Sequence, residues 1–236
     1  MSGTLSGRSA LVIGAGGLGG PAALALAAGG VGRLVVLDED EVELSNLNRQ
    51  PLFGDGDLGR RKAVVAAERI ALLHPSVRVE GRDLRFSPDV AEDLVRGSDV
   101  VVDASDNFAT RFLANDVALA AGRPLVHGAV LRYTAQFLTV MPGKTGCLRC
   151  LFEAPPAEGT VPTCAQAGVL GALAGFAGAL MGAEALRLLA GERGAYAGRL
   201  VAFEARSGRS RLVPLRIRAG CPSCSALSAS FFGSSG

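Results

Sequence analysis

Apolar residues in the first half of the chain gather in short runs, separated by glycine-rich, alanine-rich or polar segments. The runs Ala10–Ile13 and Leu34–Leu37 enclose the glycine stretch Gly14–Gly19 and an alanine-rich segment. This order predicts a strand, a tight turn, a helix and a second strand, which ends on Asp38. Since a helix joining two parallel strands of one sheet crosses over right-handed, these residues predict one βαβ unit.

Strands and helices continue to alternate up to about residue 130. The segment Glu39–Gln50 is first acidic and then rich in Asn and Arg, which predicts a loop and a short helix capped by Ser45 or Asn46. We then expect helices over Arg60–Leu73, Ser87–Val95 and Phe108–Ala121, and strands over Val77–Gly81, Asp99–Asp103 and Pro124–Gly128. This alternation is typical of a doubly wound parallel sheet.

The pattern changes in the C-terminal part. We expect a long apolar helix over Ala167–Ala183 and strands over Ala135–Met141, Leu200–Glu204 and Arg211–Ile217. The predicted fold class is α/β, a Rossmann-like doubly wound, mostly parallel sheet with additional C-terminal strands. We expect a single domain over residues 1–224, with a nucleotide-binding half at about 8–130 and a cysteine-bearing part at about 131–224. A Ser/Gly-rich tail, 225–236, is predicted to be flexible.

The composition is that of a folded protein of 236 residues, with 49% hydrophobic and 19% charged residues. A net charge of +2, no Trp and only two Tyr argue against a nucleic-acid-binding surface. The stretch after Arg8 resembles a signal peptide, but its glycines match a nucleotide-binding turn and a strand follows at once. Ala167–Ala183 is nearly long enough to span a bilayer, yet Gln166 and Glu184 bound it and a buried helix is favoured. We therefore expect a cytoplasmic protein without a membrane span.

The glycine stretch predicts a nucleotide site. Among Gly14, Gly16, Gly17 and Gly19, one makes the tight turn, one lets backbone N–H groups approach a phosphate, and one lets the helix pack against the strand. The helix N-terminus adds a partial positive charge at the same place. Asp38, at the tip of the second strand, is placed to accept hydrogen bonds from ribose hydroxyls.

Further charged residues converge on the same edge of the predicted sheet. Asp106 and Asn107 follow a buried strand, and Arg49 and Lys62 come within reach if their segments fold back over the phosphates. A carboxylate opposite basic residues and a glycine loop suits Mg²⁺-assisted phosphate chemistry. Ordinary surface ion pairs among these side chains are the alternative.

Four of the five cysteines form two CxxC pairs, Cys147 with Cys150 and Cys221 with Cys224, which we expect in loops. They are the ligand set of a tetrahedral structural zinc site, which would hold the C-terminal segment against the middle of the chain. A disulfide-bonded extracellular protein and a redox CxxC are the alternatives. The first lacks a signal sequence, and neither explains two matched pairs.

Cys164 precedes the long apolar helix, where a helix N-terminus could lower a thiol pKa. A small apolar filler is the alternative interpretation of this residue. His74 and His127 have no Ser or Cys partner pattern around them, so we interpret both as structural.

Together these motifs resemble the MoeB/ThiF adenylyltransferases, within the superfamily of enzymes that activate ubiquitin and ubiquitin-like proteins. The resemblance extends over nearly everything from Ser9 to Cys224. Its motifs are GAGGLG, Asp38, the segment Ser45–Gln50, Lys62, Ser105-Asp106-Asn107 with Arg111, the TCxxAGV-like stretch at Cys164, and the paired CxxC. A plain NAD-binding unit lacks the segment Asn46–Gln50, which argues against an NAD-dependent oxidoreductase.

The resemblance implies a homodimeric enzyme that uses ATP and Mg²⁺ to adenylate the C-terminal glycine carboxylate of a ubiquitin-like sulfur-carrier protein, with release of pyrophosphate. It implies that Asp38 holds the ribose, that Asn46, Arg49 and Lys62 hold the phosphates, and that Asp106 binds Mg²⁺. In ThiF-like relatives the cysteine matching Cys164 takes part in later sulfur transfer. Because the carboxylate is already a nucleophile, the protein mainly has to position it and neutralise phosphate charge.

Two features depart from the family pattern. Family members usually carry an N-terminal helix whose arginine enters the active site of the other subunit, whereas Arg8 lies very close to the first strand. Truncation, replacement of this arginine and weaker catalysis are the open interpretations. No rhodanese-like domain follows, so we expect a separate protein as the sulfur donor. The alternative functions are adenylation of another carboxylate, such as a peptide C-terminus or a modified tRNA base, and a non-catalytic ATP-binding relative.

Overall fold

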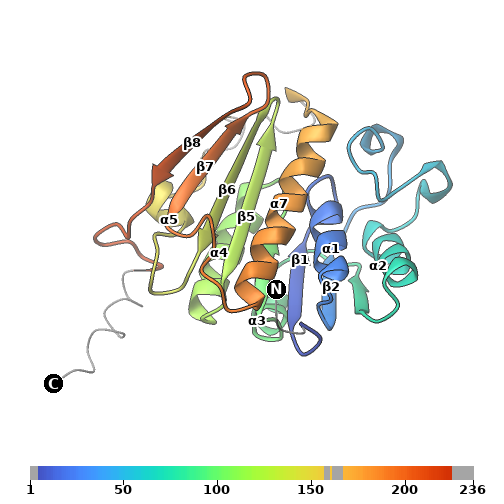
Figure 1. Ribbon diagram of the computed structural model, residues 1–236, viewed down its shortest axis with the longest axis horizontal. Coiled ribbons are helices and arrows are strands. Elements are labelled where there is room, and N and C mark those ends of the chain that lie inside the picture. Colours follow the sequence, from blue (N-terminus) through green and yellow to red (C-terminus); the bar gives the residue numbers. More distant parts are fainter. Residues whose placement is uncertain (1–4, 157–159, 161–166, 225–236) are drawn as a thin grey trace.

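A single eight-stranded sheet runs through the computed structural model, which describes residues 5–156, 160 and 167–224 (Figure 1). The strands are β1 (Ser9–Ile13), β2 (Arg33–Leu37), β3 (Arg78–Arg82), β4 (Val100–Asp103), β5 (Leu125–Leu131), β6 (Thr134–Val140), β7 (Arg199–Glu204) and β8 (Arg209–Pro214). Their order in the sheet is β3-β2-β1-β4-β5-β6-β7-β8. Neighbours from β3 to β5 are parallel, and the pairs from β5 to β8 are antiparallel. The predicted fold class is confirmed.

Helices cover both faces of the parallel part of the sheet. They are α1 (Gly19–Ala28), α2 (Lys62–Leu73), α3 (Pro88–Arg96), α4 (Phe108–Ala120), α5 (Leu148–Leu151) and α7 (Gly171–Leu189), with the short 3₁₀ turns η1 (Leu44–Asn46) and η2 (Asp55–Asp57). Alternate strand residues point to opposite faces, so each strand feeds two cores. Val12 lies in the core under α1, α2 and α7, and its neighbour Leu11 lies in the core under α3 and α4.

The long apolar helix is displaced from its predicted position, since α7 begins at Gly171 and continues beyond Ala183 to Leu189. Glu184, expected at its end, is instead only 2% exposed. Its carboxylate accepts hydrogen bonds from the Thr139 hydroxyl at 2.7 Å and from the amides of Ala195 and Tyr196 at 2.8 and 2.9 Å. A buried charge with these partners can remain inside a helix. Of the helices in the described ranges, α7 has the length and composition of a membrane span, but half of its most apolar window is buried against α1 and the sheet.

Other boundaries shift by smaller amounts. The last strand is β8, Arg209–Pro214 rather than Arg211–Ile217, because Gly208 makes the preceding turn with a φ of 66°. The predicted cap of the short helix is wrong: Glu43 occupies the N-cap of η1, and no side chain bonds to its backbone there. Ser45 donates its hydroxyl to Glu43 instead.

Candidate functional site

The carboxyl ends of β1, β2 and β4 form the edge of the sheet where the chain connections diverge to opposite faces. Two adjoining hollows of about 100 and 110 Å³ lie there. Five residues line both of them, namely Gly14, Asp38, Asp40, Ser105 and Asp106. In open α/β sheets this switch point is the usual place for a ligand.

The glycine turn has the shape that the sequence predicted. Gly14 leaves β1 with a φ of 92°, a left-handed conformation that glycine adopts without strain. A Cβ atom at Gly19, the first residue of α1, would collide with the Gly14 carbonyl. Gly16 and Gly17 lie between them and line the second hollow, at the helix N-terminus. Backbone N–H groups in this position suit a phosphate.

Asp38 anchors this turn. Its Oδ2 accepts a hydrogen bond from the Ala15 amide at 2.7 Å, and its Oδ1 accepts one from the Asp40 amide at 2.9 Å. Burial raises the pKa of Asp38, although both hydrogen bonds and the nearby Lys62 act in the opposite direction. Any bond to a ribose hydroxyl would therefore use lone pairs that these two amides leave free.

The two predicted phosphate cations both line the second hollow. Lys62 is 5% exposed, and its Nζ donates to Asp40 Oδ2 at 2.8 Å. The sequence analysis gave ordinary surface ion pairs as the alternative for these side chains. Lys62 does form an ion pair, but the pair lines the second hollow. Arg49 instead donates to the carbonyl of Ser45 and to the Asn48 side chain.

Asn46 and Gln50 come from the same segment, but only Gln50 lines the hollow. The Nδ2 of Asn46 donates to the Ser45 hydroxyl. Gln50 is 5% exposed, and its Oε1 has no hydrogen-bond partner within the described ranges. A buried acceptor without a partner is costly unless a ligand donates to it, so this part of the hollow fits an N–H or hydroxyl group. The motif contained Gln50, but the sequence did not single it out as a site residue.

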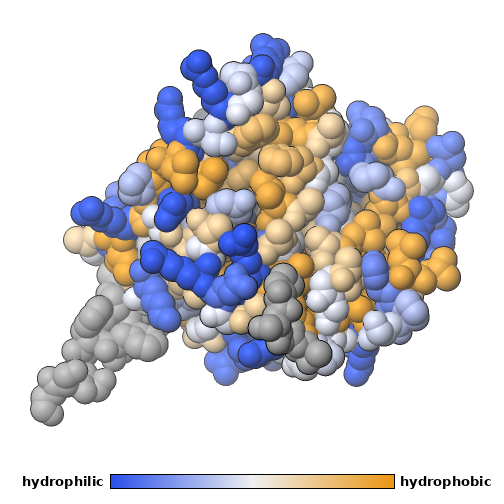
Figure 2. Space-filling view, in the orientation of Figure 1, coloured by the Kyte–Doolittle hydropathy of each residue, from blue (hydrophilic) through white to orange (hydrophobic). Residues whose placement is uncertain are grey.

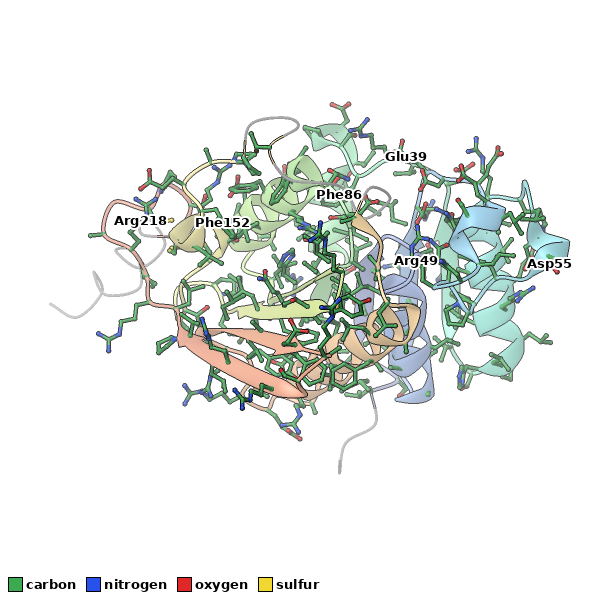
Figure 3. The ribbon with its side chains drawn as sticks, turned by 90° about the horizontal axis from the view of Figure 1, so that it is seen from above. Glu39, Arg49, Asp55, Phe86, Phe152 and Arg218 are labelled. Carbon is green, nitrogen blue, oxygen red and sulfur yellow. The ribbon has the colours of Figure 1, made fainter. Side chains whose placement is uncertain are left out.

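Asp106 and Asn107 lie on the loop between β4 and α4. Asp106 is exposed towards both hollows, whereas the Asn107 carboxamide oxygen caps α4 by accepting from the Thr110 amide at 2.9 Å. The first hollow is completed by apolar residues after β3, including Phe86, which the sequence analysis missed because that segment carries no motif. Figure 3 shows Phe86 close to Glu39, with Arg49 lying nearer to α7.

A buried network supports the Asp106 loop. Asp103, fully buried at the end of β4, accepts hydrogen bonds from the Ser105 amide and hydroxyl at 3.0 and 2.6 Å. His127 Nδ1 on β5 lies 2.7 Å from the other Asp103 oxygen. Burial raises the pKa of Asp103, but its contacts with His127, Arg111 and Ser105 together outweigh burial and hold the pKa below its usual range. His127 therefore bonds to a residue beside the Asp106 loop, and its assignment as structural stays a prediction.

The four paired cysteines form one cluster, with sulfur atoms within 4.8 Å of one another. Three Sγ–Sγ distances are 3.2 Å for Cys150–Cys224, 3.7 Å for Cys147–Cys221 and 3.9 Å for Cys147–Cys150. Four sulfurs bound to one zinc ion at 2.3 Å lie about 3.8 Å apart, so this geometry fits zinc, whereas a disulfide needs about 2 Å. Cys150 lies in α5 rather than in a loop, which corrects that detail of the prediction.

Side chains around the cysteines bind this cluster to α4. Asp116 of α4 accepts from the Arg149 guanidinium at 2.7 Å and from the Ser223 hydroxyl at 2.7 Å, which joins both CxxC segments. The Arg218 amide donates to Cys150 Sγ at 3.3 Å. In Figure 3 Arg218 lies at one side of the molecule, far from Arg49 and Phe86. The cluster is therefore placed for a structural role, apart from the hollows.

Two further predictions concern residues away from these groups. Cys164 lies outside the described residues. Arg8 lies at the amino end of β1, opposite the hollows, with a guanidinium nitrogen 3.9 Å from Asp99.

The ThiF family model matches residues 3–226. The chain is 45% identical over 221 residues to the sulfur carrier protein adenylyltransferase of Thermus thermophilus, an alignment covering 92% of this chain and 82% of that protein. It is 48% identical over 222 residues to the SAMP-activating enzyme E1 of Haloferax volcanii, covering 94% and 82%. The adenylyltransferase and sulfurtransferase MOCS3 of Xenopus laevis is 41% identical, but only 49% of its length is matched.

Among solved structures, a crystal structure of E. coli MccB with AMPCPP and MccA superposes with a TM-score of 0.80. It covers 93% of this chain and 67% of MccB at 20% identity, so the likeness concerns the fold. The glycine turn, the switch-point hollows and the four-cysteine cluster stand together in a chain that the family model matches over nearly its whole length. The protein belongs to the ThiF family.

Proposed function

We propose that this protein is an ATP-dependent adenylyltransferase that activates the C-terminal glycine carboxylate of a ubiquitin-like sulfur-carrier protein. The observation that carries this is the second hollow, where Lys62, Arg49 and Asp106 surround the glycine turn. The names of the relatives from Thermus thermophilus and Haloferax volcanii support the same activity.

In the proposed reaction a carboxylate oxygen of the carrier attacks the α-phosphorus of ATP. A bond to the acyl oxygen forms, and the bond to pyrophosphate breaks. Arg49, Lys62 and the N-terminus of α1 hold the phosphates and offset the negative charge that develops. Asn46 stays a candidate for the same role if its side chain turns away from Ser45.

Asp106 is the proposed Mg²⁺ ligand, since Mg²⁺ usually takes one or two carboxylates together with phosphate oxygens. When bound, the ion neutralises phosphate charge. Asn107 holds the loop by capping α4, and Asp38 orients the glycine turn and the ribose. We further propose that the cysteine cluster binds zinc, that Cys164 serves later sulfur transfer, and that the protein works as a cytoplasmic homodimer with a separate sulfur donor.

The proposed function predicts ATP–pyrophosphate exchange that depends on a carrier. The purified chain is incubated with ATP, labelled pyrophosphate and a ubiquitin-fold protein that ends in Gly-Gly, or with the same protein lacking its last glycine. Exchange with the first protein and background exchange with the second are the expected results. Equal exchange with both would contradict recognition of the glycine carboxylate, and ATP binding without any exchange would favour a non-catalytic relative.

The Asp103–His127 pair predicts a second result. His127→Ala should lower exchange by about 10-fold and raise the Mg²⁺ concentration needed for half-maximal exchange, because the loop that carries Asp106 loses its support. His127→Asn can still donate to Asp103 and should retain most activity. Exchange is measured over a Mg²⁺ titration, with circular dichroism to check folding. An unchanged Mg²⁺ requirement in His127→Ala would show that the pair serves only packing.

A further inference from the structure

A third hollow, of about 500 Å³, lies beside the second hollow, where we propose that ATP binds. It is bounded by the β5–β6 turn, the β7–β8 turn and the chain just before α7, which meet at one edge of the molecule (Figure 1). Val169 lines both this hollow and the second one, so the two adjoin. A chain lying in the third hollow would therefore lead to the place where the carboxylate must meet ATP.

Two arginines give this hollow a positive charge. Arg132 and Arg206 are exposed on its wall, and within the described ranges neither guanidinium lies within 4.0 Å of a carboxylate oxygen. The Arg206 guanidinium carbon lies 3.9 Å from the centre of the Tyr133 ring, which holds the cation in place without neutralising it. Glu204 lines an adjoining hollow with the same two arginines, and its carboxylate accepts hydrogen bonds from the Thr134 hydroxyl and the Arg206 amide, so two guanidinium groups face one carboxylate here.

The backbone at Arg132 is also unusual for a non-glycine residue. Arg132 is the only non-glycine residue with a positive φ, 54°, among the described residues. Its amide donates to the Gly168 carbonyl and its carbonyl accepts from the Leu170 amide, so both backbone groups are held. Glycine or asparagine would fit this turn with less strain, and strained positions gather at functional sites.

We propose that Arg132 and Arg206 bind acidic side chains of the carrier protein, in the segment just before its C-terminal glycine. This inference rests on the proposed adenylation of a carrier and names what the enzyme recognises in it. An acidic segment complements the two unpaired cations, and Figure 2 shows hydrophilic side chains gathered at the β7–β8 turn above an apolar surface.

The test compares Arg132→Gln, Arg206→Gln and the double variant with Arg193→Gln, an exposed arginine at the other end of α7 that lines none of the three hollows. The probe is a ubiquitin-fold protein ending in Gly-Gly with acidic residues just before the glycines, together with its Asp→Asn and Glu→Gln counterpart. Each single variant should raise the KM for the acidic carrier about 3-fold, and the double variant about 10-fold, with kcat unchanged. Arg193→Gln should match the wild type.

Two further arms make the outcome decisive. With the wild-type enzyme, the neutral carrier should have a higher KM than the acidic carrier. With the double variant, the KM for the neutral carrier should change little from that value. Carrier binding measured without ATP separates this inference from the proposed function: weaker binding by the double variant supports the docking site even if no exchange occurs. Wild-type affinity of the double variant for the acidic carrier, or equal loss with Arg193→Gln, would overturn the inference.

Discussion

Replacing Asp106 with alanine is expected to lower carrier-dependent pyrophosphate exchange by at least about 100-fold, with the fold intact. The side chain is exposed in both hollows, and no hydrogen bond within the described ranges depends on it. Removing the proposed Mg²⁺ ligand leaves phosphate charge unneutralised in the transition state, and groups of this kind are worth about 100- to 1,000-fold in rate.

The measurement is exchange at saturating ATP and carrier, with thermal unfolding to confirm stability. Asp93→Ala is the matched control, because Asp93 is an exposed aspartate of α3 that lines neither hollow. The control should behave as the wild type. If Asp106→Ala kept more than a tenth of the activity at ordinary Mg²⁺ concentration, Asp106 would be removed from the site.

Loss of the zinc site is expected to have the second large effect, this time on stability. Cys221→Ser should lower the free energy of unfolding by about 4 kcal/mol, seen as a fall in the melting temperature of about 10 °C. The reason is that Cys221 and Cys224 lie beyond β8, and the cluster connects their segment to α5 and α4. Metal analysis of the wild type should find about one zinc per chain.

Cys164→Ser is the control for this experiment, since it removes a cysteine and leaves the four-sulfur cluster intact. It should keep the zinc content of the wild type. Zinc binding should also release protons, because zinc binds thiolates and burial raises the pKa of the Cys147 thiol to about 11, whereas hydrogen bonds lower the pKa of Cys221 to about 7. If the wild type without zinc were folded and melted at the same temperature as the wild type with zinc, the zinc site would be refuted.

The elements that the sequence predicted well depend on short-range patterns. Gly14 and Gly19 are needed by the backbone itself, because one has a positive φ and the other has no room for a Cβ atom. The apolar runs beside them alternate between two cores and so predict buried strands. The spacing within each CxxC pair is also a short-range pattern. Two cysteines three residues apart can bind one ion, and two such pairs complete a tetrahedron, so the cluster was predicted.

The sequence analysis failed where a side chain is bound by residues far away in the chain, because local patterns do not show such partners. Glu184 reads as the end of an apolar helix, yet Thr139 of β6 and two amides near residue 195 make its burial possible. The partner of His127 was missed for the same reason, because Asp103 lies on the neighbouring strand.

The sequence by itself therefore determined the βαβ unit, the glycine turn and the cysteine pairing, since backbone sterics and residue spacing act over a few residues. Only the tertiary structure decided that Lys62 pairs with Asp40, that the Gln50 Oε1 has no partner within the described ranges, and that Arg132 and Arg206 meet beside the second hollow. These contacts join residues far apart in the chain, or depend on which neighbours surround a side chain. The neighbours of a side chain in the folded protein determine its charge interactions, its desolvation and its hydrogen bonds. These neighbours come together only after the sheet has assembled.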